Sequence, residues 1–220
     1  MFDYFYNKSL RKLVVGFGSL FNNIYVEHTN PDNQAIPLKI RVPITYAPQE
    51  KFIRRLLEPS SIANGTRVET QLPKLSYIMN GLKQDASRRR NKTIPITSTA
   101  FSGVGCSETG DQILEQIPVN ISFTLFVYTR HIDDTLQIAE QIIPFFGPDH
   151  IVEMSLNDVQ DLVQIPITMI DNNITEKYDG DLTSRRINIS SFSFIAKSFI
   201  YGPMRPYTRI TGAGSIEVED

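Results

Sequence analysis

The sequence is short of the features that many functions require. A single cysteine, Cys106, among 220 residues excludes an internal disulfide framework and is typical of a protein made in a reducing compartment. No apolar run approaches the roughly 20 residues that span a bilayer, and the first residues lack the basic-then-apolar order of a signal peptide. The net charge of −2 excludes a polycation that is drawn as a whole to nucleic acid or anionic lipid. We therefore expect a soluble protein made in a cytoplasm.

The rest of the composition is ordinary for a globular protein. Hydrophobic residues make up 41% and charged residues 21% of the chain, and 220 residues suffice for one large domain with a sizeable core. No internal repeat or low-complexity tract divides the sequence. We expect a single domain over residues 1–206 and an extension over residues 207–220.

Hydrophobic periodicity predicts both helices and strands. Apolar residues recur at spacings of three and four from Leu10 to Phe21, which is typical of an amphipathic helix, and a short helix is expected over residues 49–57. From Ile117 to Val127, apolar and polar residues alternate, as in a half-buried strand. Further strands are predicted at residues 38–48, 66–82, 161–171 and 183–202, the last two flanking the turn sequence YDGD. This mixture indicates an α+β fold.

The stretch RHIDD, residues 130–134, raises the question of a metal or acid–base site. His131 and Asp134 could supply two metal ligands, but a site needs three or four, and His28 and His150 have no ligand-like spacing to them. Two aspartates in a first helical turn interact favourably with the helix dipole, and Thr129 could serve as the cap. We interpret the stretch as the start of a helix. Its narrow apolar stripe is predicted to comprise Ile132, Leu136, Ala139 and Ile143, with Ile138 and Ile142 beside it, and its opposite face to comprise Asp133, Gln137, Glu140 and Gln141.

Other candidate sites lack the residues that their chemistry needs. The stretch DGDLTSRR, residues 179–186, has no closing glutamate of a calcium loop and is better explained as a hairpin turn with flanking charges. The glycine pair in GFGSLF has no third glycine and no preceding strand for a dinucleotide site, and the sequence points to no base for Cys106 as a nucleophile. We expect no catalytic, metal-binding or cofactor-binding residues.

The segment over residues 83–111 has few apolar anchors and predicts a long loop or hairpin arm. Its basic side chains could contact phosphates, but a solvated loop tip or pairing with acidic residues of a neighbouring subunit is favoured. Candidate interface residues are Arg88, Arg89, Arg90 and Lys92 in this arm, Arg185 and Arg186 after the YDGD turn, and Phe192 and Phe194 in the last strand.

Prolines lie inside or at the start of several predicted strands, at Pro43, Pro73, Pro118 and Pro166. Proline cannot donate to a strand ladder, so such strands must be edges, bulged or bent. The proline-free strand over residues 187–200 is therefore predicted to offer a free edge, with Phe192 and Phe194 as pockets or anchors. This strand, or its hairpin partner before YDGD, would accept a sheath segment or the C-terminal extension of a neighbouring subunit. Long, bent strands with a loose arm suit a subunit that binds its neighbours.

Four blocks of the sequence carry a resemblance. They are MFDYFYN (1–7), RVPITYAP (41–48), FVYTRHIDDTLQIAEQIIPFF (126–146) and DGDLTSRRI (179–187). In this order they resemble the tail sheath stabiliser, or tail completion, proteins of T4-like contractile-tailed bacteriophages. The resemblance implies an α+β fold like that of other tail terminators, with a central, mostly antiparallel sheet flanked by helices. The sequence departs from the family in lacking a long, Pro-rich acidic tail.

The resemblance also implies a role and partners. It indicates a virion protein, assembled in the host cytoplasm, that forms a hexameric ring on the end of the contractile tail. The expected partners are other copies of the chain, the tail sheath protein, the tube terminator and a neck protein, with no membrane, and with DNA at most passing through the ring lumen. Two alternatives stay open: a tube terminator or cap of a related contractile injection system, and an enzyme with an unrecognised site.

Overall fold

The computed structural model describes most of the chain, and for residues 96–97, 107–113 and 204–210 it describes the backbone alone. The described residues are 4–28, 37–51, 53, 72–89, 96–97, 107–113, 116–156, 162–174 and 187–210.

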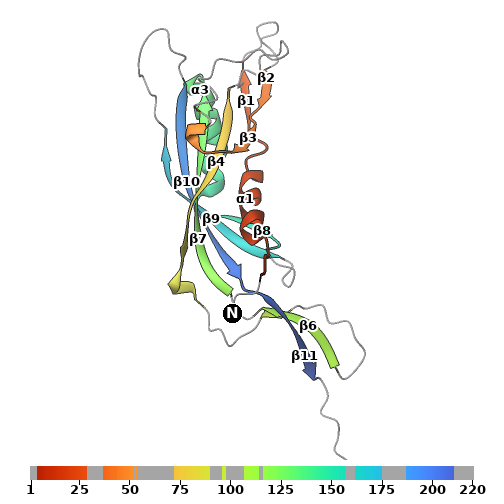
Figure 1. The fold of residues 1–220 in the computed structure, drawn as a ribbon. Helices are drawn as coiled ribbons and strands as arrows, with labels where there is room; N and C mark the ends of the chain where they lie inside the picture. The colour runs from red at the N-terminus through yellow and green to blue at the C-terminus, as the bar shows by residue number, and fades with distance from the viewer. Residues whose placement is uncertain are drawn as a thin grey trace, which may run out of the picture.

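A strongly curled six-stranded sheet forms the body of the molecule (Figure 1). In spatial order its strands are β3 (Ile44–Tyr46), β4 (Lys74–Gln84), β7 (Gln116–Thr129), β10 (Asn188–Tyr201), β9 (Val163–Asn173) and β8 (His150–Met154). Only β3 and β4 run parallel, and the other neighbouring pairs are antiparallel. The predicted α+β class with a mostly antiparallel sheet is confirmed.

Two smaller sheets accompany the main one. Strands β1 (Tyr25–His28) and β2 (Leu38–Arg41) form an antiparallel pair, and β11 (Met204–Ile210), β6 (Ser107–Ile113) and β5 (Ile96–Thr97) form a three-stranded sheet. The last residues of the predicted arm thus pair, through β6, with the first residues of the predicted C-terminal extension. Residues 38–48 were predicted as one strand, but β2 and β3 belong to different sheets because the chain breaks its pairing at Val42 and Pro43.

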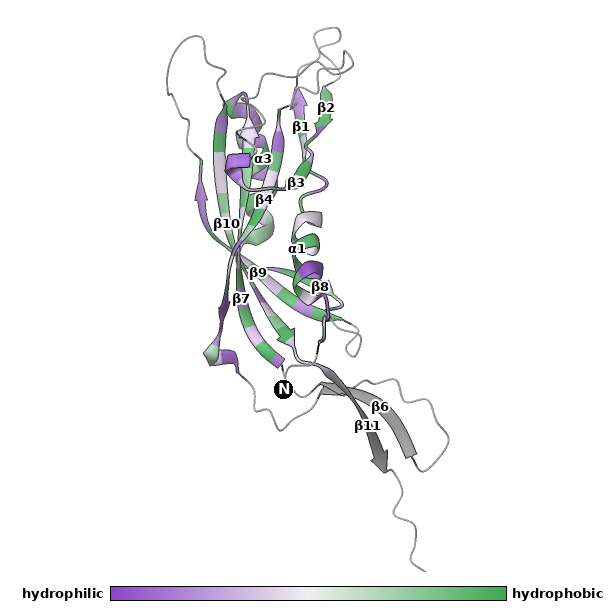
Figure 2. Ribbon diagram, viewed as in Figure 1, coloured by the Kyte–Doolittle hydropathy of each residue, from purple (hydrophilic) through white to green (hydrophobic). Residues whose placement is uncertain are grey.

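The core lies on one face of the main sheet, where the alternation predicted for β7 is observed (Figure 2). Five alternate residues of β7 are at most 1% exposed: Val119, Ile121, Phe123, Leu125 and Val127. The middle three stand opposite Phe192, Phe194 and Ala196 of β10, which are equally buried. Each fully buried side chain of this size contributes about 1.5–3 kcal/mol relative to an exposed one.

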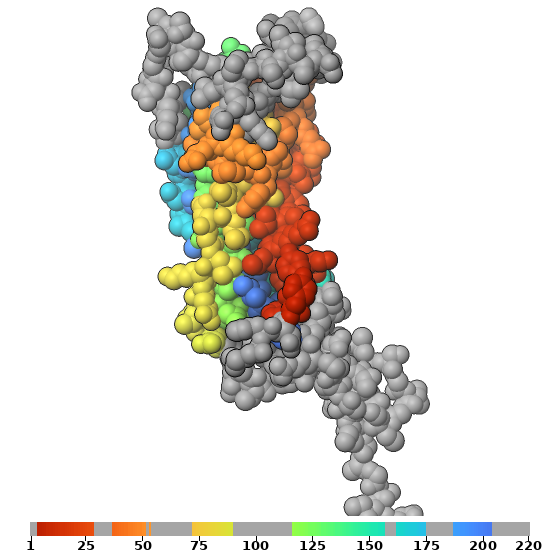
Figure 3. Space-filling view, viewed as in Figure 1, coloured from red at the N-terminus to blue at the C-terminus, as the bar shows by residue number. Residues whose placement is uncertain are grey.

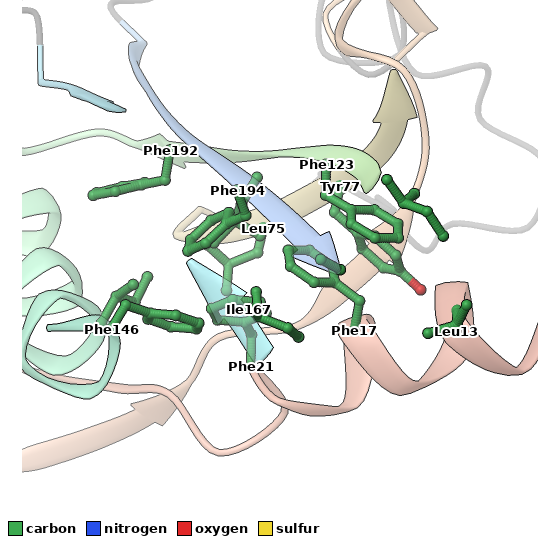
Figure 4. Packing of buried hydrophobic residues seen from close by; sticks show 14 of the residues in the cluster. Leu13, Phe17, Phe21, Leu75, Tyr77, Phe123, Phe146, Ile167, Phe192 and Phe194 are labelled. Atoms are coloured by element: carbon green, nitrogen blue, oxygen red, sulfur yellow. The ribbon is translucent and has the colours of Figure 1, made fainter. Parts of the chain in front are cut away.

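Helix α1 (Ser9–Ser19) lies against this face, as the spacing of its apolar residues predicted. Phe17 stacks on Phe123 with ring centroids 4.3 Å apart and meets Phe194 edge-on at 5.4 Å (Figure 4). Glycines allow the close approach: a Cβ at Gly18 would overlap the Tyr77 hydroxyl and lie 2.5 Å from the ring carbon Cζ. Gly18 therefore has a packing role against β4, whereas the other glycine of the pair, Gly16, faces Met154 of β8.

Helix α3 (Ile132–Ile142) starts where RHIDD predicted a helix, with Asp133 and Asp134 in its first turn. The cap position is His131, not Thr129, whose hydroxyl instead lies 2.6 Å from the Thr135 hydroxyl. The buried stripe is displaced from the predicted centre. Ala139 is buried as predicted, and Ile138 and Ile142, predicted beside the stripe, are buried too, whereas Leu136 and Ile143 are exposed. The 3₁₀ turn η2 (Ile143–Phe146) follows and places Phe146 against Phe194, with ring centroids 4.8 Å apart.

Two glutamines one turn apart on α3 complete the edge of β1. The Gln141 side chain accepts from the Tyr25 N–H and donates to the Tyr25 carbonyl, at 3.2 and 2.7 Å. Gln137 repeats the pattern on Glu27, at 2.9 and 3.2 Å. A side-chain amide offers both a donor and an acceptor, so each glutamine substitutes for a residue of a neighbouring strand. The small sheet is thereby attached to α3.

The prolines lie where strands start, bend or change partner. Pro43 precedes β3, Pro73 precedes β4, and Pro118 is the third residue of β7. Pro166 lies inside β9, next to the residue where that strand changes partner: β9 pairs with β8 from Val163 to Ile167 and with β10 from Ile167 onward. Two residues bulge out of the register: Asn80 of β4, between Met79 and Gly81, and Ile170 of β9, opposite the Ser193–Phe194 step of β10.

The predicted free edge at residues 187–200 is wrong. Strand β10 is central: it pairs with β7 along its whole length and with β9 from Ser191 to Ala196. Among the described residues, the outer strands of the main sheet are β3 and β8. Residues 49–51 and 53 are helical, as predicted, and the remainder of that predicted helix lies outside the described residues.

Candidate functional surfaces

The acidic start of α3 forms a structural contact. His28 Nε2 lies 2.8 Å from Asp134 Oδ1, which connects β1 to the first turn of α3. The Asp134 side chain is 5% exposed and that of His28 is 38% exposed. Within the part of the chain that the structure describes, no three His, Cys, Asp or Glu side chains gather to hold a metal ion.

The β1–β2 sheet carries an ion pair on its surface. Glu27 and Lys39 stand directly opposite each other in the register, and Lys39 Nζ lies 2.8 Å from Glu27 Oε1. The hydrogen bond and the charge of Glu27 raise the pKa of Lys39. Both side chains are well exposed, so water and salt screen the pair.

No helix among the described residues is long and apolar enough to cross a bilayer.

The first arginine of the predicted arm is bound within its own chain. Arg88 lies in the 3₁₀ turn η1 (Ala86–Arg88); its Nε donates to Asp85 at 2.8 Å and its Nη2 donates to the Asn120 side chain at 2.7 Å. Its guanidinium carbon also lies 5.5 Å from the centroid of the Phe199 ring. Hydrogen bonds from Ser87 and Arg88 hold the pKa of Asp85 well below its usual range. Arg88 thus holds the end of β4 against β7 and β10.

The other interface residues predicted from the sequence are exposed, buried in the core or outside the described residues. Arg89 is exposed, while Arg90, Lys92, Arg185 and Arg186 lie outside the described residues. Phe192 and Phe194 are 0% exposed in the core and cannot anchor a partner strand at a free edge. The interface role of the arginines stays a prediction.

Several large apolar side chains instead reach the surface, and the sequence analysis did not single them out. Tyr4 and Tyr6 are 93% and 57% exposed before α1, and Phe145 is 65% exposed in η2. Ile151 on the outer strand β8 is 58% exposed. In the space-filling view the segment before α1, in dark red, stands at the surface (Figure 3). Clustered aromatic residues at the start of the chain were the available signal for part of this set.

A well-packed sheet with exposed apolar side chains, and with no cluster of metal-binding side chains among the described residues, is the pattern of a structural subunit that binds other proteins. Comparison with known proteins agrees. The sequence matches the family described as T4-like virus Myoviridae tail sheath stabiliser over residues 4–217. It is also 32% identical over 210 residues to the tail completion protein gp15 of Enterobacteria phage T4, covering 93% of this chain and 74% of that protein. The chain belongs to the tail sheath stabiliser family and is a structural protein of a contractile phage tail.

Proposed function

We propose that copies of this chain form a hexameric ring that caps the contractile tail and holds the last ring of sheath subunits in place. The family match over residues 4–217 is the observation that carries this proposal. A capped sheath cannot lose subunits from its end, so a ring that binds the terminal layer stabilises the whole sheath. The role is mechanical and needs no catalytic site.

The sheet suits a part that must transmit load. Strands β7 and β10 pair over fourteen residues, from Asn188 opposite Thr129 to Tyr201 opposite Gln116, and their inward side chains are fully buried. Such a sheet opens only with the global loss of the core. It gives the exposed side chains on its ends a rigid support. We place the contacts with sheath, tube terminator and neck protein on those ends, with DNA at most passing through the ring lumen.

Electron microscopy of the purified protein tests the ring, and sixfold particles with a central opening are expected. Affinity capture then tests the partners. The immobilised protein should retain sheath protein more strongly than tube protein if it is a sheath cap, whereas a tube terminator would show the reverse preference. Monomers that retain neither protein would refute the proposal. Assembly is expected in the host cytoplasm, before the head is joined.

A further inference from the structure

An apolar groove lies between the C-terminal end of α1 and the C-terminal end of α3. Its volume is about 430 Å³. Apolar side chains form most of its lining: Leu20, Phe21, Ile24, Ile142 and Phe146. Phe145 at its rim is 65% exposed, although the next residue, Phe146, is 6% exposed. A phenyl ring held in water beside an apolar groove marks a contact surface for another apolar group.

The groove also has polar groups at its border. Asn23 contributes an amide, and His150 contributes an imidazole whose ring centroid lies 5.6 Å from that of Phe146. The Gln141 amide also lines the border, but it already pairs with Tyr25. An occupant that fits both regions is apolar along its body and polar at its tip. Tyrosine has this form, because its ring is apolar and its hydroxyl donates and accepts hydrogen bonds.

The same chain displays such side chains at the opposite end of α1. Tyr4, Phe5 and Tyr6 are 93%, 50% and 57% exposed. This aromatic segment has a fixed root: the Asn7 side-chain amide donates to the carbonyl oxygens of Tyr201 and Gly202, each at 3.1 Å. The segment is therefore presented at one place at the foot of α1, in dark red in Figure 3.

The aromatic segment cannot fill the groove of its own chain. Helix α1 has 11 residues, so its axis measures about 17 Å at 1.5 Å per residue, and the groove begins beyond its last turn. Three residues span at most about 11 Å when fully extended, and their root at Asn7 precedes the first turn. An aromatic segment that reaches such a groove must come from another copy.

We propose that Tyr4–Tyr6 of one copy docks in the apolar groove between the C-terminal ends of α1 and α3 of the neighbouring copy, so that this contact joins successive subunits. The inference rests on the proposed ring. Segment and groove are different surfaces, so the contact is head-to-tail, and head-to-tail contacts close into rings when the rotation permits. An aromatic side chain buries about 150–250 Å². Three of them supply a large share of the roughly 800 Å² per partner that a stable interface buries.

Disulfide trapping between two different chains tests the contact. Cys106→Ser removes the native thiol, and Tyr4→Cys and Phe145→Cys are then made in separate chains of different length. Both positions are exposed, so neither change disturbs the core. Oxidation of the mixture should give the heterodimer as the main cross-linked product, at least fivefold over either homodimer. A matched mixture of Tyr4→Cys with Ile170→Cys, 58% exposed on β9, should give no preferred heterodimer.

A second measurement separates failure of this contact from failure of the ring. Tyr4→Ser with Tyr6→Ser should lower the ring fraction in analytical ultracentrifugation at least tenfold, with an unchanged melting temperature of the monomer, while Ile170→Ser should leave the rings intact. Wild-type rings without the heterodimer, or intact rings of the double variant, overturn the docking proposal alone. A bridge within one chain carrying both cysteines also overturns it. A wild-type protein that stays monomeric overturns the ring and the contact together.

Discussion

His28 on β1 and Asp134 in the first turn of α3 are joined by a contact of 2.8 Å between Nε2 and Oδ1, across 106 residues of sequence. Asp134 is 3% exposed, whereas its neighbour Asp133 is exposed. The two aspartates of RHIDD therefore have different roles. Asp133 interacts with the helix dipole from the surface, and Asp134 connects two secondary-structure elements.

Replacing the two aspartates separately should reveal this difference. Asp134→Ala removes the buried partner of His28 and should lower the free energy of unfolding by about 1–3 kcal/mol. Asp133→Ala should cost only about 0.3–1 kcal/mol, the usual contribution of a surface charge in a first turn. Urea unfolding at neutral pH measures both. Equal costs would show that the contact with His28 contributes nothing.

The glutamine pairing of β1 predicts a graded series at one position. Gln141→Ala removes both hydrogen bonds to Tyr25 and should cost about 1–2 kcal/mol. Gln141→Glu retains an acceptor for the Tyr25 N–H but cannot donate to the Tyr25 carbonyl. The stability of this variant should therefore lie between that of the wild type and that of Gln141→Ala. The neighbouring change Glu140→Ala, on an exposed residue, should stay within about 0.5 kcal/mol of the wild type. An order other than wild type, glutamate, alanine would contradict the pairing.

The two glycines of α1 predict opposite outcomes for the same substitution. An alanine methyl at Gly18 would collide with the buried Tyr77 ring, and overpacking of this kind costs about 1–3 kcal/mol. At Gly16 the methyl would meet the terminal methyl of Met154, at 2.5 Å, which is the flexible end of a side chain. Gly16→Ala should therefore be neutral or gain up to about 1 kcal/mol of helix propensity. Thermal unfolding of both variants measures the two effects. A destabilised Gly16→Ala variant together with a stable Gly18→Ala variant would refute the described packing of Gly18 on Tyr77.

The turn at Asp85 predicts an acid dependence. Its pKa is lowered by hydrogen bonds from Ser87 and Arg88, so the ionised form is favoured in the folded state. The stabilisation is fully present above the unfolded pKa of about 4 and is lost as the pH falls below it. The melting temperature of Asp85→Asn should thus lie below that of the wild type at pH 7, and the gap should shrink below pH 4. A difference in melting temperature that grows towards low pH would contradict the stabilising role of the ionised Asp85 side chain.

The elements that the sequence predicted well have a single apolar face. The alternation from Ile117 to Val127 identified β7, and the spacing from Leu10 to Phe21 identified α1, because burial on one side leaves a clear period. Helix α3 was located correctly, but the centre of its buried side was misassigned. Its apolar residues surround much of the axis, so Leu136 and Ile143 were as acceptable as Ile138 and Ile142 until neighbouring elements were known.

The contacts that depend on distant residues could not be predicted. The alternation in β10 is visible in the sequence, but it does not reveal that β7 and β9 occupy its two sides, and the free edge predicted there is wrong for that reason. Gln137 and Gln141 were correctly placed away from the core, yet nothing local indicates that β1, more than 100 residues earlier, lies against them. The family resemblance supplied the function that no single motif could.

Imaging of contractile tails assembled with and without this chain shows whether it caps and stabilises the sheath. Tails assembled from tube and sheath with the wild-type protein should show a ring on the end of an extended sheath that persists through dilution. Without the protein, the same sheath should shorten or shed subunits from that end. Sheaths that stay equally long without it, or a protein that never appears at the tail end, would contradict the account.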